Sequence, residues 1–270
     1  MLILAFDTTS EKGGVGIFRD TENLAWVPNE GPANRYSITL FEMVEQALAR
    51  ARLELREIEL YAVANGPGSF TGIRVGLAAA RAWGKAFDRR VRGASVLEAM
   101  VHKQGLGIRD SGLGESIRLS TSERAGEGFL PSQRLSRPDW AFPILDARRG
   151  EFFLGSFRRK PSPSPIVTRP DYEPADGGWV LKPESLRTFV QERLASGASA
   201  TCVVRAQDRA AADLRASLPA SLNWQQVEGA LVDSIADIAR REEQASRPCS
   251  DAKLDAYYIR RPDAEINWKG

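Results

Sequence analysis

Residues 65–80 read NGPGSFTGIRVGLAAA, and the fold is decided around this stretch. It follows the apolar run LYAVA at residues 60–64, whose aromatic and β-branched content predicts a buried strand. Gly66-Pro67-Gly68 then breaks the chain, because glycine admits backbone angles that are closed to other residues and proline fixes its own φ. Ser69 or Thr71 can accept hydrogen bonds from the free amides that begin a helix. The stretch therefore predicts a strand, a tight turn and a helix.

The predicted helix runs to about residue 87 and carries a stripe of small residues. Gly72, Gly76, Ala80 and Gly84 recur every four positions and so line one face. Each glycine inside a helix costs about 0.8–1 kcal/mol relative to alanine, so something must approach this backbone closely. Three interpretations stay open: packing on a neighbouring helix of the same domain, contact with a partner protein's helix, or a phosphate cradle formed with residues 66–68. The stretch lacks the lysine of a P-loop.

Length and composition suit two modest domains or one large one. The chain has 270 residues, of which 43% are apolar, and its 37 basic and 35 acidic residues leave a net charge of +2. This balance predicts no strong nucleic-acid footprint. Cys202 and Cys249 are too few for a disulfide framework, and Cys202 is expected to be a buried small hydrophobe in a strand at 200–204. With no signal peptide and no membrane span predicted, we expect a cytoplasmic protein.

His102 is the single histidine of the chain. Zinc sites and histidine-based general bases usually need further His, Cys or Asp side chains nearby. We therefore expect a surface or capping histidine, no metal site, and neither metallopeptidase nor serine-triad chemistry.

The first hundred residues predict an α/β domain, assigned to residues 1–104. Its predicted strands and helices alternate along the chain: strands at 2–7, 15–18, 24–27, 60–64 and 91–95, and helices near 34–52, 70–87 and 96–103. Asp7 is followed by Thr8 and Thr9, as in the first phosphate loop of the actin, sugar-kinase and Hsp70 superfamily. An ordinary polar hairpin turn explains these three residues equally well.

A second domain is predicted over residues 105–270, with a loop-rich start at 105–140. Residues 142–146 repeat the form of the first strand and end at Asp146, and residues 151–157 return as its hairpin partner. Two halves that each open with strand, aspartate, turn and strand indicate a structural duplication. The second turn carries Arg148 and Arg149 where a phosphate loop needs glycines, so a nucleotide-hydrolysing site there is incomplete. Further predictions are a proline-rich surface loop at 161–174, helices at 182–194 and 231–241, and a C-terminal stretch, 254–262, that packs back on this domain.

Three separated stretches together resemble the bacterial TsaB family, also called YeaZ. They are ILAFDTT at 3–9, GPGSFTGIR at 66–74 and DARRGE at 146–151, with YIR at 258–260 closing the chain. The resemblance covers both halves in order and is most marked over residues 1–100. It implies a duplicated, two-domain actin-like fold of the ASKHA, ribonuclease H-like type, related to TsaD and the glycoprotease-like proteins.

The resemblance also implies a role in making threonylcarbamoyladenosine at position 37 of ANN-decoding tRNAs. In that family this protein is not the catalyst but pairs with TsaD, which transfers the threonylcarbamoyl group, and a small ATPase, TsaE, joins the complex. No cofactor is expected on this chain alone, ATP or ADP is expected only at the assembled interface, and tRNA is reached only through the complex. Whether the free chain is a homodimer is left open.

The family implies that the subunit contact lies on the helices at about 34–52 and 70–87. The expected partner interface comprises Phe41, Gly72, Arg74, Gly76, Ala80 and Gly84. The residues expected near any phosphate or nucleotide are Asp7, Thr8, Thr9, Gly66, Gly68 and Ser69. No catalytic or metal-binding residue is expected. The family commonly shows His-Ser where this chain has Tyr36-Ser37, which puts a role for that position in doubt.

Two alternatives compete with a partner subunit. One is a stand-alone phosphotransferase of the actin-like superfamily that uses Asp7 and Asp146 with Mg-ATP, which the Arg148-Arg149 turn disfavours. The other is a metallopeptidase, which the lone His102 disfavours.

Overall fold

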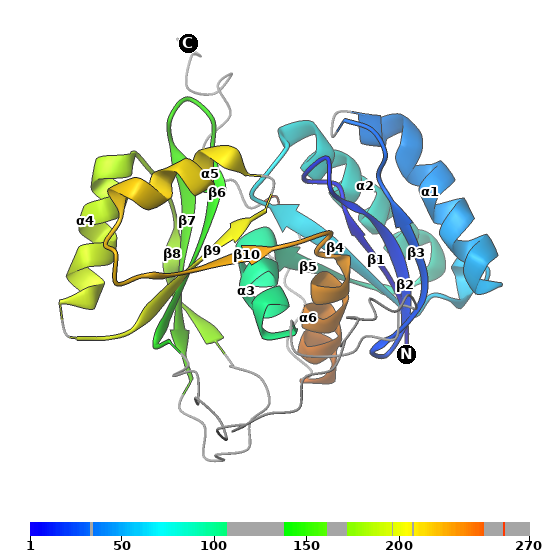
Figure 1. The fold of residues 1–270 in the computed structure, drawn as a ribbon. Helices are drawn as coiled ribbons and strands as arrows, with labels where there is room; N and C mark the ends of the chain where they lie inside the picture. The colour runs from blue at the N-terminus through cyan, green and yellow to red at the C-terminus, as the bar shows by residue number, and fades with distance from the viewer. Residues whose placement is uncertain are drawn as a thin grey trace, which may run out of the picture.

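Two five-stranded sheets, each with its own helices, make up the molecule (Figure 1). The computed structural model describes residues 1–32, 35–106, 138–160, 172–195, 197–206, 208–245 and 256. None of the helices in these ranges combines the length and the apolar content needed to cross a bilayer.

The first sheet has the strand order β3-β2-β1-β4-β5. Its strands are β1 (Leu2–Asp7), β2 (Gly14–Arg19), β3 (Glu22–Pro28), β4 (Leu60–Gly66) and β5 (Arg90–Ser95). β1, β2 and β3 form an antiparallel meander, and β4 and β5 run parallel to β1. The predicted strands of the first hundred residues are all present.

The second sheet repeats this arrangement, with the order β10-β9-β6-β7-β8. Its strands are β6 (Trp140–Asp146), β7 (Phe152–Arg159), β8 (Tyr172–Leu181), β9 (Ala200–Arg205) and β10 (Asn223–Val227). β6, β7 and β8 form an antiparallel meander, and β9 and β10 run parallel to β6. Because each sheet reads third, second, first, fourth, fifth strand, the duplicated two-domain α/β fold is confirmed.

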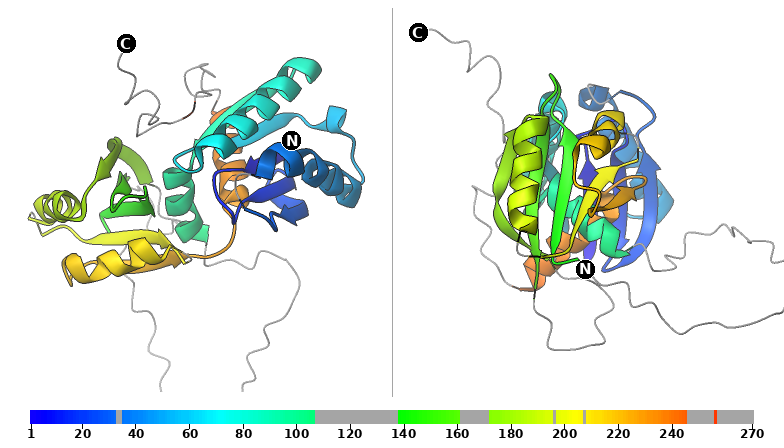
Figure 2. Two further views of the ribbon diagram at one scale, coloured as in Figure 1. Left: turned by 90° about the horizontal axis from the view of Figure 1, so that it is seen from above. Right: turned by 60° about the vertical axis from the view of Figure 1, so that its left-hand side comes forward.

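Helices cover these sheets in layers (Figure 2). The elements are α1 (Tyr36–Ala51), η2 (Leu55–Glu57), α2 (Phe70–Phe87), α3 (Val96–Leu106), α4 (Pro183–Leu194), α5 (Arg209–Asp213), η3 (Leu214–Ser217) and α6 (Val232–Gln244). α1 and α2 pack on the outer face of the first sheet, whereas α3 and α6 lie between the two sheets. α1 and α2 therefore lie on the outside of the first sheet, as α4 and α5 do on the second.

The first sheet is buried on both faces, which explains its nearly continuous apolar strands. Successive side chains of a strand point to opposite faces. In β1, Ile3 and Ala5 join the cluster that contains α3 and α6, while Leu4 and Phe6 join the cluster under α1 and α2. All four side chains have no exposed surface.

β8, β10 and α5 were not predicted from the sequence, and residues 172–174 were assigned to a loop. β8 contains Pro174, Gly177 and Gly178, which are unfavourable in an interior strand. It lies at the edge of its sheet, where a missing amide and an exposed backbone are tolerated. Residues 107–137 of the loop-rich start predicted at 105–140, residues 161–171 of the predicted proline-rich loop and nearly all of the C-terminal stretch lie outside the described residues.

α6 connects the two halves of the chain. It follows the second sheet in sequence but packs on β1, β2, β4 and β5 of the first sheet, as well as on α3. The division at residues 104 and 105 stays a prediction, and residues 232–244 cover the first sheet whichever way the chain is divided.

Candidate functional site

The three exposed large hydrophobic side chains of the described residues all lie on α1 and α2. Ile38 is 64% exposed, Phe41 is 53% exposed and Phe70 is 38% exposed. Single exposed apolar residues are common on protein surfaces, but here all three belong to two helices that contact each other. We call Ile38, Phe41, Phe70 and the exposed Arg74 the α1–α2 face.

The α1–α2 face is firmly supported from below. α1 buries Leu40, Val44 and Ala47 against the sheet, which leaves Phe41 directed outward. The Phe41 ring meets Trp83 of α2 edge-on, with 5.6 Å between ring centroids. On α2, the Arg74 guanidinium carbon lies 3.9 Å from the centroid of the Phe70 ring. Aromatic rings with an arginine are the residue types that contribute most to binding at protein interfaces.

The small-residue stripe of α2 faces the protein's own interior, which contradicts the predicted partner contact for four of its residues. Gly72, Gly76, Ala80 and Gly84 are all buried. A Cβ atom on Gly72 would lie 1.9 Å from the Thr8 carbonyl oxygen, and one on Gly84 would lie 2.5 Å from a Val91 methyl carbon.

Gly76 has the same environment, because its Cβ would lie 2.5 Å from Thr8 Oγ1 and 3.2 Å from a Val63 methyl carbon. The absent side chains let α2 settle onto β4, β5 and the turn after β1. The stripe packs against a sheet and a turn rather than against another helix. Phe41 and Arg74 keep their predicted exposure, and their role as interface residues stays a prediction.

The turn that follows β1 lies beneath the amino-terminal ends of both helices. Asp7 is fully buried, and its Oδ1 accepts hydrogen bonds from the Thr9 amide at 2.8 Å and from the Thr9 hydroxyl at 2.6 Å. The Thr8 hydroxyl donates to the Gly72 carbonyl at 2.7 Å, and the Ser69 amide donates to the Thr9 carbonyl at 2.7 Å. The two predicted phosphate loops are thus bound to each other.

Ser69 is the residue before α2, where its hydroxyl accepts from the Gly72 amide at 3.3 Å. This confirms the predicted capping role. Gly66 has a φ of 116°, a backbone conformation that L side chains rarely adopt. A Cβ on Gly68 would lie 2.6 Å from the Thr9 carbonyl oxygen, so this glycine permits close approach to the neighbouring loop rather than to a ligand.

Arg205, the last residue of β9 in the second sheet, reaches into this turn. Its Nη2 lies 3.3 Å from Asp7 Oδ2, and its Nη1 donates to Ser10 Oγ at 2.6 Å. The side chain is 8% exposed. Asp7 is therefore paired across the two halves of the molecule.

Tyr36 begins α1 and fills the remaining side of the turn. Its hydroxyl donates to the Ser10 carbonyl at 2.9 Å, and the side chain is buried. Burial, and secondly the Asp7 carboxylate, raise the pKa of Tyr36 far above its usual range. The hydroxyl therefore keeps its proton and remains a donor.

The first predicted phosphate loop does not fit magnesium and phosphate in this arrangement. Both oxygens of Asp7 are already engaged, one by Thr9 and the other by the Arg205 guanidinium. The Ser69 amide donates its hydrogen bond to the Thr9 carbonyl and so is not free to donate to a phosphate oxygen.

Asp146, the second acid of the phosphotransferase hypothesis, forms a hydrogen bond within the turn that follows it. Its Oδ1 accepts from the Arg148 amide at 2.7 Å, and its amide donates to Asp208 Oδ2 at 2.8 Å. Arg148 and Arg149 both have positive φ values, 66° and 58°. Within the described residues, His, Cys, Asp and Glu side chains do not gather in threes as metal ligands.

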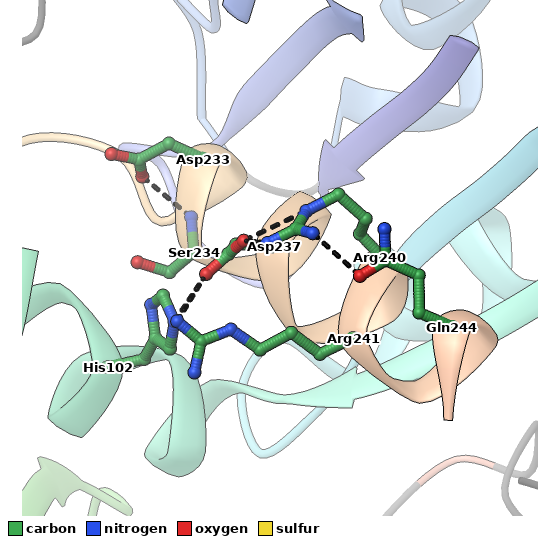
Figure 3. A network of polar contacts seen from close by, with 7 residues as sticks. All are labelled: His102, Asp233, Ser234, Asp237, Arg240, Arg241 and Gln244. Atoms are coloured by element: carbon green, nitrogen blue, oxygen red, sulfur yellow. Dashed lines mark hydrogen bonds and ion pairs between the residues drawn. The ribbon is translucent and has the colours of Figure 1, made fainter. Parts of the chain in front are cut away.

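His102 is not a surface histidine, which corrects the expectation from the sequence. Its side chain is 13% exposed, and its Nε2 lies 2.9 Å from Asp237 Oδ2 on α6 (Figure 3). Arg240 pairs with Asp237 Oδ1, and Arg241 Nη2 lies 2.9 Å from Asp237 Oδ2. Burial alone would raise the pKa of Asp237, but His102, Arg240 and Arg241 together hold it well below its usual range. The lone histidine thus helps to join α3 to α6.

Three residues of the site were missed by sequence reasoning. Ile38 and Phe70 stand at positions where the amphipathic pattern of their helices calls for a polar side chain, and that mismatch was a usable signal. The sequence around Arg205 gave no signal of its role, because an arginine that ends a strand is expected to reach solvent. Only the approach of the two sheets brings it to Asp7.

Comparison with known proteins gives matches to two related groups. The family model of TsaD, tRNA N6-adenosine threonylcarbamoyltransferase, matches residues 27–111. A tRNA N6-adenosine threonylcarbamoyltransferase from Metallosphaera sedula is 31% identical over 104 residues, which is 34% of this chain and 31% of that protein. The tRNA threonylcarbamoyladenosine biosynthesis protein TsaB from Bacillus subtilis is 27% identical over 163 residues, 57% of this chain and 71% of that protein.

Solved structures match over nearly the whole length. An uncharacterised Pseudomonas aeruginosa protein with similarity to peptidase YeaZ has a TM-score of 0.64 and 18% identity, and covers 96% of this chain and 99% of its own. Among the curated relatives the shared span is shorter, about a third of the length of the Metallosphaera sedula protein. The chain is therefore similar to TsaB proteins in sequence and to YeaZ in fold, and part of its first half matches the family model of TsaD.

Proposed function

We propose that the chain is a non-catalytic partner subunit in the biosynthesis of threonylcarbamoyladenosine in tRNA, and that it docks a TsaD-like catalytic subunit through the α1–α2 face. The observation that carries the proposal is the exposure of Ile38, Phe41 and Phe70 on two helices that contact each other and lie on the outside of the first sheet. The names of the TsaB and TsaD relatives supply the pathway and the kind of partner.

The chemistry of the turn after β1 supports a partner over a stand-alone phosphotransferase. A phosphotransferase needs a carboxylate that is free to hold magnesium next to the phosphates. Asp7 is buried and paired with Arg205, and Asp146 is engaged by the amide of its own turn. Sustained ATP hydrolysis by the purified chain alone would favour the phosphotransferase instead.

The proposal has three further parts. A TsaE-like ATPase is the third component of the complex, a nucleotide binds at the assembled interface, and the chain contacts tRNA only through the complex. The same face can also pair with a second copy when the partner is absent, since exposed aromatic side chains favour burial irrespective of the partner. Sedimentation of the free chain and of the mixture with the TsaD-like subunit distinguishes these states.

The α1–α2 face is tested by placing a charge in its centre. Phe41→Asp and Phe70→Asp are each expected to weaken binding of the TsaD-like subunit by about 30-fold or more, because aromatic anchors at interfaces contribute about 2 kcal/mol or more. Gln191→Asp, which adds the same charge at an exposed position of α4, serves as the control. Titration calorimetry measures the affinities, and circular dichroism checks that each variant is folded.

Equal binding by the folded Phe41→Asp and Phe70→Asp variants would contradict the location of the interface. If the unaltered chain does not bind the TsaD-like subunit, the proposed partnership itself is wrong.

A further inference from the structure

Arg205 makes a contact that joins the second sheet to the turn at residues 7–10. Its guanidinium bridges Asp7 Oδ2 and Ser10 Oγ, and Asp7 has no exposed surface. The Arg205 Nε is also buried and has no hydrogen-bond partner among the described residues. Burying a cation with an unsatisfied donor is costly, so its placement is not explained by local hydrogen bonding alone.

The turn at residues 7–10 is in turn attached to the first residues of both interface helices. Ser10 accepts from the Tyr36 hydroxyl at the start of α1. Thr8 donates to Gly72, and Thr9 accepts from the Ser69 amide, at the start of α2. Ile38 follows Tyr36 by two positions, and Phe70 follows Ser69 directly. The position of this turn therefore determines where the exposed side chains of the two helices stand relative to each other.

These contacts form one continuous path from the second sheet to the α1–α2 face. It runs from Arg205 to Asp7 and Ser10, then through Tyr36 to α1 and through Thr8 and Thr9 to α2. Every link is a hydrogen bond or ion pair between residues that are largely buried, and buried pairs are screened little by solvent. Coupling between distant positions requires a physical network of this kind.

We propose that Arg205 is a positioning residue for partner binding. From the second half of the chain it supplies the positive charge that holds Asp7 and Ser10 in place, and the turn so fixed sets the spacing of the two helices of the α1–α2 face. The inference rests on the proposed function for the identity of the partner, but the positioning of the turn does not depend on it.

Because Asp7 pairs with Arg205, its role in this arrangement is structural. In a loop that holds phosphate, the acid after the first strand faces a metal ion and the neighbouring amides face phosphate oxygens. Here one guanidinium meets that acid, and the loops close on each other. Direct contacts of Arg205 therefore join the two halves of the molecule at this turn.

Hydrogen exchange of the free chain tests the positioning directly. In Arg205→Ala, amides of residues 8–10, 36–41 and 69–74 are expected to exchange about tenfold faster, whereas β6, β7 and β9 keep their protection. Arg205→Lys keeps the charge but not the planar fork that spans two acceptors, so it is expected to be intermediate. Arg187→Ala, at an exposed position on α4 of the same half, is the control and should change none of these segments.

A second variant covers the case in which Arg205→Ala folds poorly. Without the guanidinium, Asp7 is a buried charge without its partner, and Asp7→Asn removes that charge while its side-chain oxygen still accepts from Thr9. Asp7→Asn combined with Arg205→Ala should therefore unfold at a higher temperature than Arg205→Ala alone. In the double variant the helix starts should still exchange faster than in the unaltered chain.

Affinity for the TsaD-like subunit gives the functional readout. Arg205→Ala, or the double variant, is expected to bind about tenfold more weakly than Arg187→Ala. Unchanged exchange at the three segments, or a loss of protection spread evenly over both sheets, would overturn the positioning role. Faster exchange with unchanged affinity would refute the link to partner binding while leaving the proposed function in place. Failure of the unaltered chain to bind would refute the proposed function, and exchange would still decide the positioning.

Discussion

Gly72 and Gly76 show how tightly α2 lies on the turn after β1. The Gly72 carbonyl accepts a hydrogen bond from the Thr8 hydroxyl. The Gly72 backbone also lies so close to the Thr8 carbonyl that no side chain fits between them. In an exposed helix, replacing glycine by alanine stabilises by about 1 kcal/mol. Here the same methyl group would force the helix away from the sheet, and tertiary packing outweighs helix propensity.

Gly72→Ala is therefore expected to lower the free energy of unfolding by about 1–3 kcal/mol, the usual range for an overpacked core. Ala82→Gly, at an exposed position of the same helix, is the control and should cost about 1 kcal/mol by propensity alone. Urea denaturation followed by circular dichroism measures both. A stabilised Gly72→Ala protein would show that α2 does not rest on Thr8. Gly76→Leu, with three further carbons at a similar position, should not fold stably.

At the scale of elements, α3 and α6 are joined by a polar cluster that lies between the sheets (Figure 3). The Asp237 carboxylate pairs with His102 of α3 and with Arg240 and Arg241 of its own helix. Lys103 of α3 pairs with Asp233 of α6 at 2.7 Å, but both of these side chains are more exposed. Since α6 covers the first sheet, the Asp237 cluster bears on the stability of the whole core.

Asp237→Asn is expected to lower the free energy of unfolding by about 2 kcal/mol at pH 7, because hydrogen bonds to a charged group are lost. The pKa of Asp237 is lower in the folded than in the unfolded protein, so its contribution is complete above the unfolded value of about 3.9. It is then lost as the pH falls below that value towards the folded pKa.

Urea titrations between pH 3 and pH 7 measure this dependence. The difference between the unaltered chain and Asp237→Asn should shrink below about pH 4, since Asp237 of the unfolded chain then takes up a proton while Asp237 of the folded chain stays charged. Asp233→Asn, which removes a more exposed acid of the same helix, should cost less than about 1 kcal/mol. A difference that does not depend on pH would contradict the charged state of Asp237.

At the scale of the whole molecule, the two halves share one interior. The cluster that contains Ile3 and Ala5 of the first sheet also contains Val203 of the second sheet and Ile235 of α6. Each sheet has a second, separate cluster on its other face, under α1 and α2 in the first half and around α4 and α5 in the second. The shared cluster makes the first half depend on a helix from near the end of the chain.

A fragment of residues 1–106 is therefore expected to lack a cooperative thermal transition, because the face of the first sheet covered by α6 would be open to water. The dye ANS, which binds exposed apolar surface, should fluoresce strongly with the fragment and weakly with the full chain. Circular dichroism during heating supplies the transition. A fragment that unfolds as cooperatively as the full chain would contradict the dependence on α6.

The sequence by itself determined the strands and helices whose patterns are strong and local. The apolar runs at 2–7 and 60–64, the capped helix after Ser69 and the aspartate-ended repeat at 142–146 all predicted the observed elements, and the repeat predicted the duplicated fold. Local periodicity suffices where an element buries one or both faces completely. It fails for β8, whose exposed edge position tolerates Pro174 and two glycines.

Only the tertiary structure decided what the small residues of α2, His102 and Asp7 contact. Spacing showed that Gly72, Gly76, Ala80 and Gly84 share a face, but the same spacing suits a sheet, a neighbouring helix or a partner. Arg205 reaches Asp7 across 198 positions of the chain, and no local pattern encodes which charges a fold brings together over that distance. The sequence sets what each segment forms, whereas the packing of distant segments determines which side chains remain outside for a partner.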